Sequence, residues 1–327
     1  MIRRREFIML LGGATAAWPL AAWAQQQAMP VIGFLYPGAL ERNGNLVAAF
    51  RKGLAERGYI EGRNVAIEFR AAGGEIDRVP AMVADLVRRQ VAVIFANGPA
   101  VIAAHAATTT IPIVFQIAPD PVQLGLIVSM SRPGGNLTGS TSLNVEVGQK
   151  RLELLHEMVP KANIIALLVN PSSPNLAEAQ SRDLQTAADQ LGLQLHVLHA
   201  STEGEFDPVF SRVAQLHAGG LVISSDSLFF SRSGHLATLA VRHSVPAIYG
   251  FRESVVAGGL MSYGGSLAES HRWLGVYTGR ILKGEKPTNL PVQQSTKVEL
   301  IINLKAATAI GLEIPPTLLA RADEVIE

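Results

Sequence analysis

The chain has 327 residues, of which 48% are hydrophobic and 17% are charged, as expected of a globular protein with a large core. Its formal charge is +1, and without the arginines Arg3, Arg4 and Arg5 and the glutamate Glu6 the remainder carries −1. No basic tract remains to bind nucleic acid or an anionic membrane surface. The chain contains no cysteine, which excludes disulfides, thiolate catalysis, cysteine-bound metals and a lipoprotein anchor.

The N-terminal segment Met1–Ala24, MIRRREFIMLLGGATAAWPLAAWA, looks like an export signal. A basic start precedes a modestly apolar run from Phe7 to Ala22, and Ala22-Trp23-Ala24 matches the pattern of small residues at a signal-peptidase site. Arg4 to Ile8 resembles the twin-arginine motif, which directs export of folded proteins. An uncleaved anchor is the alternative, but the run is shorter than the roughly 18 apolar residues of a spanning helix. We therefore expect residues 1–24 to be a cleavable, twin-arginine-like signal peptide and the mature protein to lie free in the periplasm.

The rest of the chain alternates short apolar runs with amphipathic stretches, which is typical of βα units on a parallel sheet. In the first half we expect helices such as 46–57 and 79–89. The strands between them are predicted at Val31–Leu35, Val65–Phe69, Val91–Ala96 and Ile111–Ile117.

After a helix predicted around 147–158, the same pattern begins again. VAVIFANGPA in the first half corresponds to GGLVISSDSL in the second. A repeat of about 130 residues is too long for a solenoid unit, so it indicates two doubly wound parallel-sheet lobes, with chance similarity of βα units as the alternative. The second set of strands is predicted at Ile164–Val169, Gln194–Leu198, Gly220–Ser224 and Ala247–Tyr249.

We expect the lobes to be built from separate segments of the chain. The first lobe is predicted over residues 29–140 plus about 260–290, and the second over 141–259 plus about 291–327. The hinges are expected near Gly139–Leu143 and Gly258–Ser262, with a further crossing from Pro291. Because ligands of open α/β sheets bind beyond the carboxyl ends of the strands, two facing lobes would hold a ligand in the cleft between them.

Several loops of the first lobe suit a small polar ligand. Asn97-Gly98-Pro99 leads directly into a helix, and the free N–H groups of the segment from Gly98 to Ala100 could hold an anionic group, with Asn97 and Ser225 as side-chain partners. A helix start that only caps itself is the alternative. Gln116 is a further candidate at the end of the next strand. Asp120, held between Pro119 and Pro121, is a candidate for contact with a cationic group or for a hinge anchor.

In the second lobe the candidates are Asn170, Ser225 and Asp226, which follow predicted strands. The loop at Ser225 and Asp226 can cap its own helix or present an acceptor to a ligand ammonium. Arg252 and Glu253 are best explained as a solvent-exposed ion pair. Tyrosine rings at strand ends could enclose the apolar part of a ligand, although ordinary packing explains each of them equally well; these are Tyr36, Tyr249 and Tyr263.

Enzyme motifs are missing from the sequence. It contains no phosphate-binding G-x-x-x-x-G-K-[ST] loop and no G-x-G-x-x-G after a strand, and the HEMVP segment at His156 lacks the second histidine of a zinc helix. GGSLA at Ser266 lacks the second glycine of a nucleophile elbow. We therefore expect no enzyme, metal or cofactor. The alternative is an exported α/β hydrolase-like enzyme that uses Asp120 and Asp226 as acid and base.

The chain also resembles the periplasmic substrate-binding proteins of ABC transporters, in the group that includes tryptophan- and tyrosine-type binding proteins. The resemblance implies an α/β type I periplasmic-binding-protein fold, a clamshell with a multi-segment hinge that closes on its ligand. Asp120-Pro121-Val122 and the acidic loop around Asp226 match the family pattern, whereas Asn97-Gly98-Pro99 stands where the family usually has Gly-Thr-Pro. The matching stretches include AFRKGLAERGYIEGRNVAIEFRAAGG, DPVQLGLIVSMSRPGGNLTG, KRLELLHEMVP and GGLMSYGGS.

These features together predict an exported solute-binding protein that captures a small polar ligand, such as an amino acid or an aromatic or organic acid. It would deliver the ligand to an ABC permease in the inner membrane and act as a monomer without nucleic acid. A ligand-sensing module for a signalling receptor is a second alternative beside the hydrolase, because it would use the same clamshell.

Overall fold

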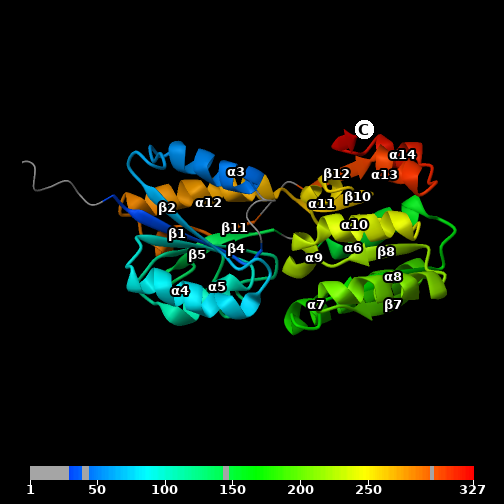
Figure 1. Cartoon of the computed structure of the whole chain (residues 1–327), viewed down its shortest axis with the longest axis horizontal. Coiled ribbons are helices and arrows are strands. Elements are labelled where there is room, and N and C mark those ends of the chain that lie inside the picture. Colours follow the sequence, from blue (N-terminus) through cyan, green and yellow to red (C-terminus); the bar gives the residue numbers. More distant parts are fainter. Residues whose placement is uncertain (1–28, 39–43, 143–146, 295–297) are drawn as a thin grey trace, which may run out of the picture.

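The computed structural model describes residues 29–38, 44–142, 147–294 and 298–327. These residues form two α/β lobes that lie side by side (Figure 1). The first lobe contains a six-stranded sheet in the order β11-β5-β4-β3-β1-β2, in which all neighbours are parallel. Its strands are β1 (Val31–Tyr36), β2 (Ala66–Ala71), β3 (Val93–Asn97), β4 (Ile113–Ile117), β5 (Leu137–Thr141) and β11 (Gln293–Gln294).

The second lobe contains a seven-stranded sheet in the order β13-β12-β10-β9-β8-β6-β7. Its neighbours are parallel except for β12, which runs antiparallel to β10. The order β2-β1-β3-β4-β5 of the first sheet recurs here as β7-β6-β8-β9-β10, so the predicted internal repeat is confirmed. The strands are β6 (Ile164–Val169), β7 (Gln194–His199), β8 (Gly220–Ile223), β9 (Ala247–Tyr249), β10 (Met261–Gly265), β12 (Val298–Asn303) and β13 (Glu324–Ile326).

Helices cover both faces of the first sheet because its central strands are apolar on both sides. Val93 and Phe95 of β3 pack with α3 (Gly44–Ala55) and α12 (Leu267–Leu282), whereas Ile94 and Ala96 pack with α4 (Val79–Arg88) and α5 (Ala100–Ala107). Helices α3 and α12 lie close together because glycines face each other's backbone. A Cβ at Gly275 would overlap the carbonyl oxygen of Phe50 and would lie 2.9 Å from the nitrogen of Leu54.

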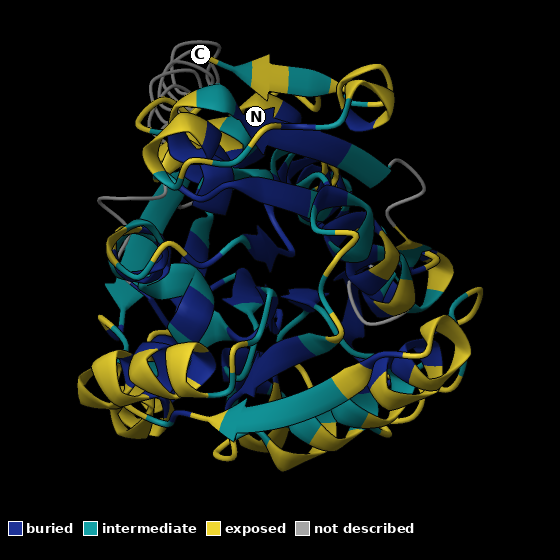
Figure 2. Cartoon of the chain, turned by 90° about the vertical axis from the view of Figure 1, so that its right-hand side faces the viewer, coloured by how far each residue is buried: buried dark blue, intermediate teal, exposed yellow. Residues whose placement is uncertain are grey.

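The second sheet is covered in the same way. One face packs with α6 (Gly148–Met158), α7 (Pro174–Leu191), α13 (Leu304–Ala309) and α14 (Pro316–Leu319), and the other with α8 (Phe206–Gln215) and α10 (Ser233–Arg242). In Figure 2 the central strands are dark blue and the outward faces of the helices are mostly yellow. The short helices α9 (Ser227–Ser231) and α11 (Arg252–Val256) follow β8 and β9.

The predicted pair of doubly wound lobes is confirmed, but two segment boundaries were wrong. β10 hydrogen-bonds to β9 and β12 and thus belongs to the second lobe, although about 260–290 was assigned to the first. The chain therefore passes from the second lobe to the first at Ser266, between β10 and α12, and not at Gly258–Ser262. β11 pairs with β5, so the last crossing follows Gln294 and not Pro291.

Two other expectations fall partly or wholly outside the described residues. Gly139 to Thr141 lie within β5, and the crossing expected at Gly139–Leu143 follows Ser142, with residues 143–146 outside the described part. The predicted signal peptide, residues 1–24, also lies outside it. Within the described ranges, no helix is long and apolar enough to cross a membrane.

Candidate functional site

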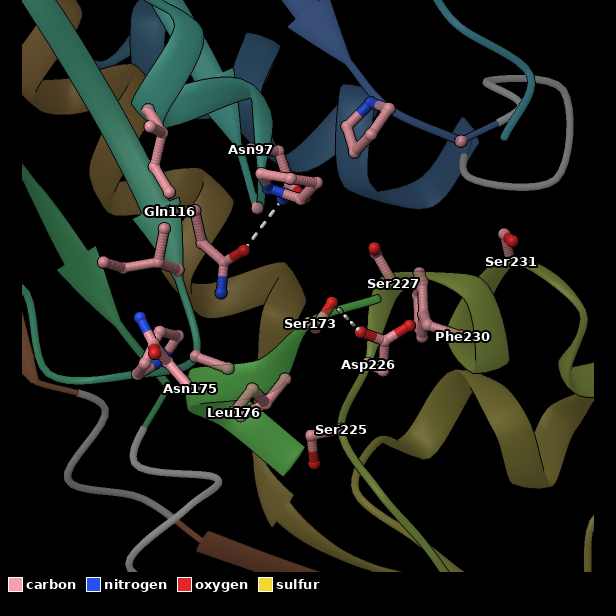
Figure 3. A pocket seen from close by; sticks show the side chains of 18 of the residues that line it. Asn97, Gln116, Ser173, Asn175, Leu176, Ser225, Asp226, Ser227, Phe230 and Ser231 are labelled. Atoms are coloured by element: carbon pink, nitrogen blue, oxygen red, sulfur yellow. Dashed lines mark hydrogen bonds between the residues drawn. The ribbon is translucent and has the colours of Figure 1, made fainter. Parts of the chain in front are cut away.

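A cavity of about 280 Å³ lies between the two lobes. This volume is close to the lower end of the range of roughly 300–1,000 Å³ for small-molecule sites. Its lining comes from the carboxyl ends of β1, β3 and β4 in the first lobe and from the loops after β6, β8 and β9 in the second. Figure 3 shows side chains of both lobes converging on it. The cavity therefore lies where the repeated βα architecture predicts a ligand.

The structure brings many of the predicted residues together at this cavity and leaves others outside it. Asp226 and Ser225 line the cavity from the second lobe. Ala100, Asp120, Asn170, Tyr249 and Tyr263 are not part of the lining. The predicted residues that line the cavity from the first lobe are Tyr36, Asn97, Gly98, Pro99 and Gln116.

Asp226 provides the negative charge of the site. It is 3% exposed and caps α9, where its Oδ1 accepts hydrogen bonds from the backbone nitrogen of Leu228 (2.8 Å) and from Nδ2 of Asn170 (3.0 Å). Its Oδ2 accepts from Oγ of Ser173 at 2.8 Å, a bond drawn in Figure 3. All three donors are neutral, and they occupy three of about four acceptor positions of the carboxylate. One position is left for a ligand donor, and Asn170 contributes by orienting Asp226.

No lysine, arginine or histidine is found among the described residues that line the cavity, and Asp226 is the one carboxylate there. A buried carboxylate is stabilised by an opposite charge much more than by neutral donors alone. The cavity therefore suits a ligand that brings a cation, such as an ammonium group, to the second lobe.

An amide pair lies on the opposite, first-lobe side of the cavity. Asn97 and Gln116 are neighbours in the parallel ladder of β3 and β4, and Nδ2 of Asn97 donates to Oε1 of Gln116 at 2.8 Å. Gln116 is 5% exposed, and its Nε2 points into the cavity in Figure 3. The pair therefore presents an N–H donor from a fixed side chain to whatever occupies the cleft.

The turn before α5 differs from the predicted anion-binding helix start. Gly98 has φ +54°, in the left-handed region that favours glycine, and its nitrogen donates to the carbonyl oxygen of Gln116 at 2.8 Å. Its carbonyl oxygen accepts from the nitrogen of Val101 at 3.1 Å. Ala100 is fully buried and does not line the cavity. Gly98 and Pro99 thus shape the wall, and part of the backbone hydrogen-bonding capacity of the turn is used within it.

The remaining wall is mostly apolar. Tyr36 is 4% exposed, and burial, with the nearby Glu253 carboxyl second, raises the pKa of its hydroxyl, so the ring stays neutral. Sequence reasoning missed most of this wall because its members belong to helices and loops with no polar motif. Ser173 lies in the NPSSP segment after β6, which corresponds in the repeat to the Tyr36-Pro37-Gly38 segment after β1. The missed apolar residues are Ile102, Leu124, Leu126, Leu176, Phe230, Phe251 and Leu267.

Asp120, which was predicted to contact a cationic group or to anchor a hinge, lies outside the lining of the cavity and closes a local turn. Its Oδ1 accepts a hydrogen bond from the nitrogen of Val122 at 2.8 Å, and its carbonyl oxygen accepts from the nitrogen of Leu124. The carboxylate therefore closes its own Asx turn, held by the prolines on either side. Asp226 lines the cavity and Asp120 does not, so the lining does not bring these two carboxyl groups together.

Two of the three tyrosines are also outside the cleft. Tyr249 is 2% exposed within the core of the second lobe, where its ring lies against Gly259, and burial raises the pKa of its hydroxyl. Tyr263 on β10 packs against the other core, and its carbonyl oxygen accepts from Nε of Arg151 at 2.8 Å. Ser225 lines the cavity, but its hydroxyl points away from Asp226 and lies against Gly250 (Figure 3).

Among the described residues, no group of three or more histidines, cysteines, aspartates or glutamates is placed to hold a metal ion.

Comparisons with known proteins agree with this geometry. A tyrosine-binding protein of Clostridioides difficile (strain R20291) is 28% identical over 267 residues, which cover 81% of this chain and 76% of that protein. The crystal structure of an ABC domain in complex with L-Trp from Streptococcus pneumonia is 26% identical, has a TM-score of 0.80 and covers 91% of this chain and 100% of its own.

The arrangement of the lobes resembles the ligand-bound relative more than an open one. A ligand-free, open structure of a substrate-binding protein with adhesive properties from Clostridium difficile is also 26% identical and covers 91% of this chain and 99% of its own. Its TM-score is only 0.66, against 0.80 for the L-Trp complex. The overall match is therefore better to the ligand-bound relative than to the open one.

The fold is that of type I periplasmic binding proteins. It is shared with a leucine-binding protein from Thermotoga maritima at a TM-score of 0.55, with 12% identity and coverage of 77% of this chain and 81% of that one. The model of the family described as ABC transporter substrate binding protein matches residues 41–326. The chain belongs to the family of ABC transporter substrate-binding proteins.

Proposed function

We propose that the cleft binds an amino acid with a large apolar side chain, of the aromatic class. The observation that carries this proposal is the buried Asp226 carboxylate, held by neutral donors in a cavity whose described lining carries no other charge. A ligand ammonium would take the acceptor position that remains on Asp226. The Nε2 of Gln116 would donate to the ligand carboxylate, and the apolar wall would enclose the side chain. The names of the tyrosine-binding relative and of the L-Trp complex support the same class.

We further propose that the protein is a monomeric carrier that delivers its ligand to an ABC permease and catalyses no reaction. The family membership supports delivery, and the placement of Asp120 outside the cavity lining supports binding without acid–base catalysis. The basic start, apolar run and small-residue cleavage pattern of residues 1–24 support export to the periplasm with loss of this segment.

The first test is calorimetric titration of the mature protein with L-tryptophan, L-tyrosine, L-leucine and indole-3-propionate, which lacks the amino group. We expect an aromatic amino acid to bind at one site per chain and to remain chemically unchanged, and the des-amino compound to bind far more weakly. Asp226→Asn should raise the Kd by about 10- to 100-fold, since hydrogen bonds to charged groups contribute about 1.5–3 kcal/mol. Asp189→Asn, on the exposed outer side of α7, is the matched control and should leave the Kd unchanged.

Two results would contradict the proposal. If neither aromatic amino acid bound, or if indole-3-propionate bound as tightly as L-tryptophan, the ammonium would not be the recognised group. If a ligand were consumed during the titration, the protein would be an enzyme and not a carrier.

A further inference from the structure

The lobes contact each other beside the cavity through a small apolar cluster, here called the interlobe cluster. Leu46 of α3 and Leu267 of α12 belong to the first lobe, and Phe251 and Phe230 belong to the second. Leu46 is 1% exposed, Leu267 5% and Phe251 8%. The rings of Phe230 and Phe251 meet edge to face with centroids 5.1 Å apart. Because the cluster has members on both lobes, its burial depends on closure.

Glu253 lies next to the interlobe cluster, in the first turn of α11. Its Oε1 accepts a hydrogen bond from Nδ2 of Asn45, on α3 of the first lobe, at 3.5 Å. Its Oε2 is buried and has no hydrogen-bond partner in the described part of the chain. The contact between the lobes therefore shields one oxygen of this carboxyl group from solvent without giving it a partner among the described residues, which is costly for a charged group.

The predicted solvent-exposed pair of Arg252 and Glu253 is not formed. Nε and Nη2 of Arg252 donate to the two carboxylate oxygens of Glu324, on β13, at 2.6 Å each. Arg252 and Glu253 follow each other in the first turn of a helix, where successive side chains point in different directions. The guanidinium of Arg252 is therefore paired with Glu324 on β13, whereas the Glu253 carboxyl faces Asn45 of the first lobe.

The groups around Glu253 favour its neutral form in the closed arrangement. Burial is the largest effect and raises the pKa of Glu253, and Glu299 on β12 adds repulsion. The backbone N–H of Glu253 itself, then Arg252 and the Asn45 amide, oppose the shift in the pKa without cancelling it. From the first lobe, the hydroxyl of Tyr36 also faces this carboxyl, which contributes to the raised pKa of Tyr36. No other charged partner of Glu253 is found in the described structure.

We propose that Glu253 is a positioning residue that couples closure of the lobes to the uptake of one proton, so that the ligand is held more tightly as the pH falls. The proton comes from solvent and is returned when the lobes open, and no covalent bond changes. Glu253 does not line the cavity, so it acts through closure and not through contact with the ligand. The use of an amino acid to measure this effect rests on the proposed function.

The direction in which the ligand affinity changes with pH follows from the difference in the pKa of Glu253 between the open and the closed arrangement. In the open arrangement Asn45, Tyr36 and Leu46 move away with the first lobe, and the Glu253 carboxyl is rehydrated with an ordinary pKa of about 4.3. Between this value and the raised pKa of the closed form, closure takes up a proton, so lowering the pH favours the closed, ligand-bound state. Above this window Glu253 stays charged in both forms, and below it Glu253 is neutral in both. Within the window the affinity changes by at most about tenfold per pH unit, because one group binds one proton.

The experiment compares wild type with Glu253→Gln, which is the neutral form of the same shape, and titrates L-tryptophan and L-tyrosine from about pH 4 to pH 8. Glu153→Gln, an exposed glutamate on α6 of the second lobe, is the matched control. The ratio of the wild-type Kd to the Glu253→Gln Kd removes the titration of every other group. We expect this ratio to be close to one at the acidic end and to rise by up to about tenfold per pH unit to a plateau. The Kd of Glu153→Gln should follow that of wild type at every pH.

A ratio that stays constant across the pH range, or that falls as the pH rises, would overturn the proposal. Thermal unfolding of each variant, followed by circular dichroism, identifies any loss of fold, and Leu46→Ala provides a second variant. Leu46→Ala removes apolar contacts of the interlobe cluster without changing any charge. It should therefore raise the Kd by the same factor at every pH and leave the slope of the Kd against pH unchanged. A changed slope in Leu46→Ala would also count against the role of Glu253.

A second measurement needs no ligand. The chain has no cysteine, so Arg88→Cys on α4 and Arg182→Cys on α7 give one exposed labelling site on each lobe, on the same side of the molecule (Figure 1). Distances between two spin labels should show a larger closed fraction for Glu253→Gln than for wild type at neutral pH, and acidification should raise it in wild type only. Equal closed fractions would overturn the proposal even if no amino acid bound. Binding of L-tryptophan with a constant ratio would overturn it while leaving the proposed function intact.

Discussion

At the scale of single residues, His271 carries a pH dependence of stability. It is fully buried on α12, its Nδ1 lies 2.8 Å from the carbonyl oxygen of Leu267, and its Nε2 is buried without a partner among the described residues. Burial lowers the pKa of the imidazole to about 4. The folded protein therefore keeps this histidine neutral at pH values where the unfolded chain would protonate it.

The expected consequence is a loss of stability in acid. As the pH falls from about 6.5 towards 4, the His271 imidazole is protonated in the unfolded state but stays neutral in the folded state. The free energy of unfolding therefore falls by on the order of 3 kcal/mol. Below about pH 4 both states bind the proton and the loss stops. His271→Phe should remove this part of the pH dependence in urea unfolding, whereas His199→Phe, at an exposed position on β7, should keep it. Equal slopes for wild type and His271→Phe would show that the imidazole is hydrated in the folded state.

Single residues also show that the sequence located the ends of the strands but not the direction of the side chains that follow them. Asp226 was predicted as either a helix cap or a ligand acceptor, and the structure places it as a cap that lines the cleft. Asp120 and Tyr249 follow strands in the same way, yet one closes its own turn and the other packs in a core. The apolar pattern locates the end of a strand, but the direction of the next side chain depends on loop torsions that a single sequence does not encode in its periodicity.

At the scale of elements, the contact of α3 with α12 fixes the first-lobe side of the interlobe cluster, because Leu46 and Leu267 lie on these two helices. The helices approach closely at Gly53 and Gly275, where any side chain would meet the backbone of the partner helix. The pairing of these two elements was not predicted. It joins a helix near the start of the described chain to one near its end, with the whole repeat between them, and nothing in either helix alone indicates the other.

Gly275→Ala should separate α3 from α12. A Cβ at this position overlaps backbone atoms that cannot move aside as a flexible side chain could, so we expect destabilisation of about 1–3 kcal/mol or more from overpacking. Gly44→Ala at the start of α3 is the control, because its Cβ would meet nothing within 4 Å. Chemical denaturation of both variants measures the difference. If Gly275→Ala were as stable as Gly44→Ala, the close helix crossing would not exist in solution.

Elements near the lobe boundaries were the least predictable part of the fold. Strands β1, β3, β4, β6, β8 and β9 were recognised from continuous apolar runs, which mark strands buried on both faces. β11 has only two residues, Gln293 and Gln294, and carries no such run. The position of β11 is determined by its pairing with β5 at the edge of the first-lobe sheet, which is a tertiary contact.

At the scale of the whole molecule, the export proposal predicts the fate of the segment Met1–Ala24. In its own bacterium the periplasmic protein should begin at Gln25, as determined by N-terminal sequencing and intact mass. The double variant Arg4→Lys, Arg5→Lys should remain in the cytoplasm as the full-length precursor, because lysine does not reproduce the planar guanidinium of arginine. Arg3→Lys is the control and should be exported.

Two other results would revise that proposal. A periplasmic double variant would indicate the general secretion route, and a periplasmic protein that still began at Met1 would indicate an uncleaved anchor.

The chain crosses between the lobes after Ser142, at Ser266 and after Gln294, which leaves the first lobe without α12 until late in synthesis. Leu274, Val276 and Tyr277 of α12 complete the core around Phe34 and Phe95. In a nascent chain synthesised only as far as the start of α6, this face of the first sheet is therefore covered by α3 alone and partly exposed. We expect this nascent chain to stay incompletely folded, and to depend on protection by other proteins, until translation is almost finished.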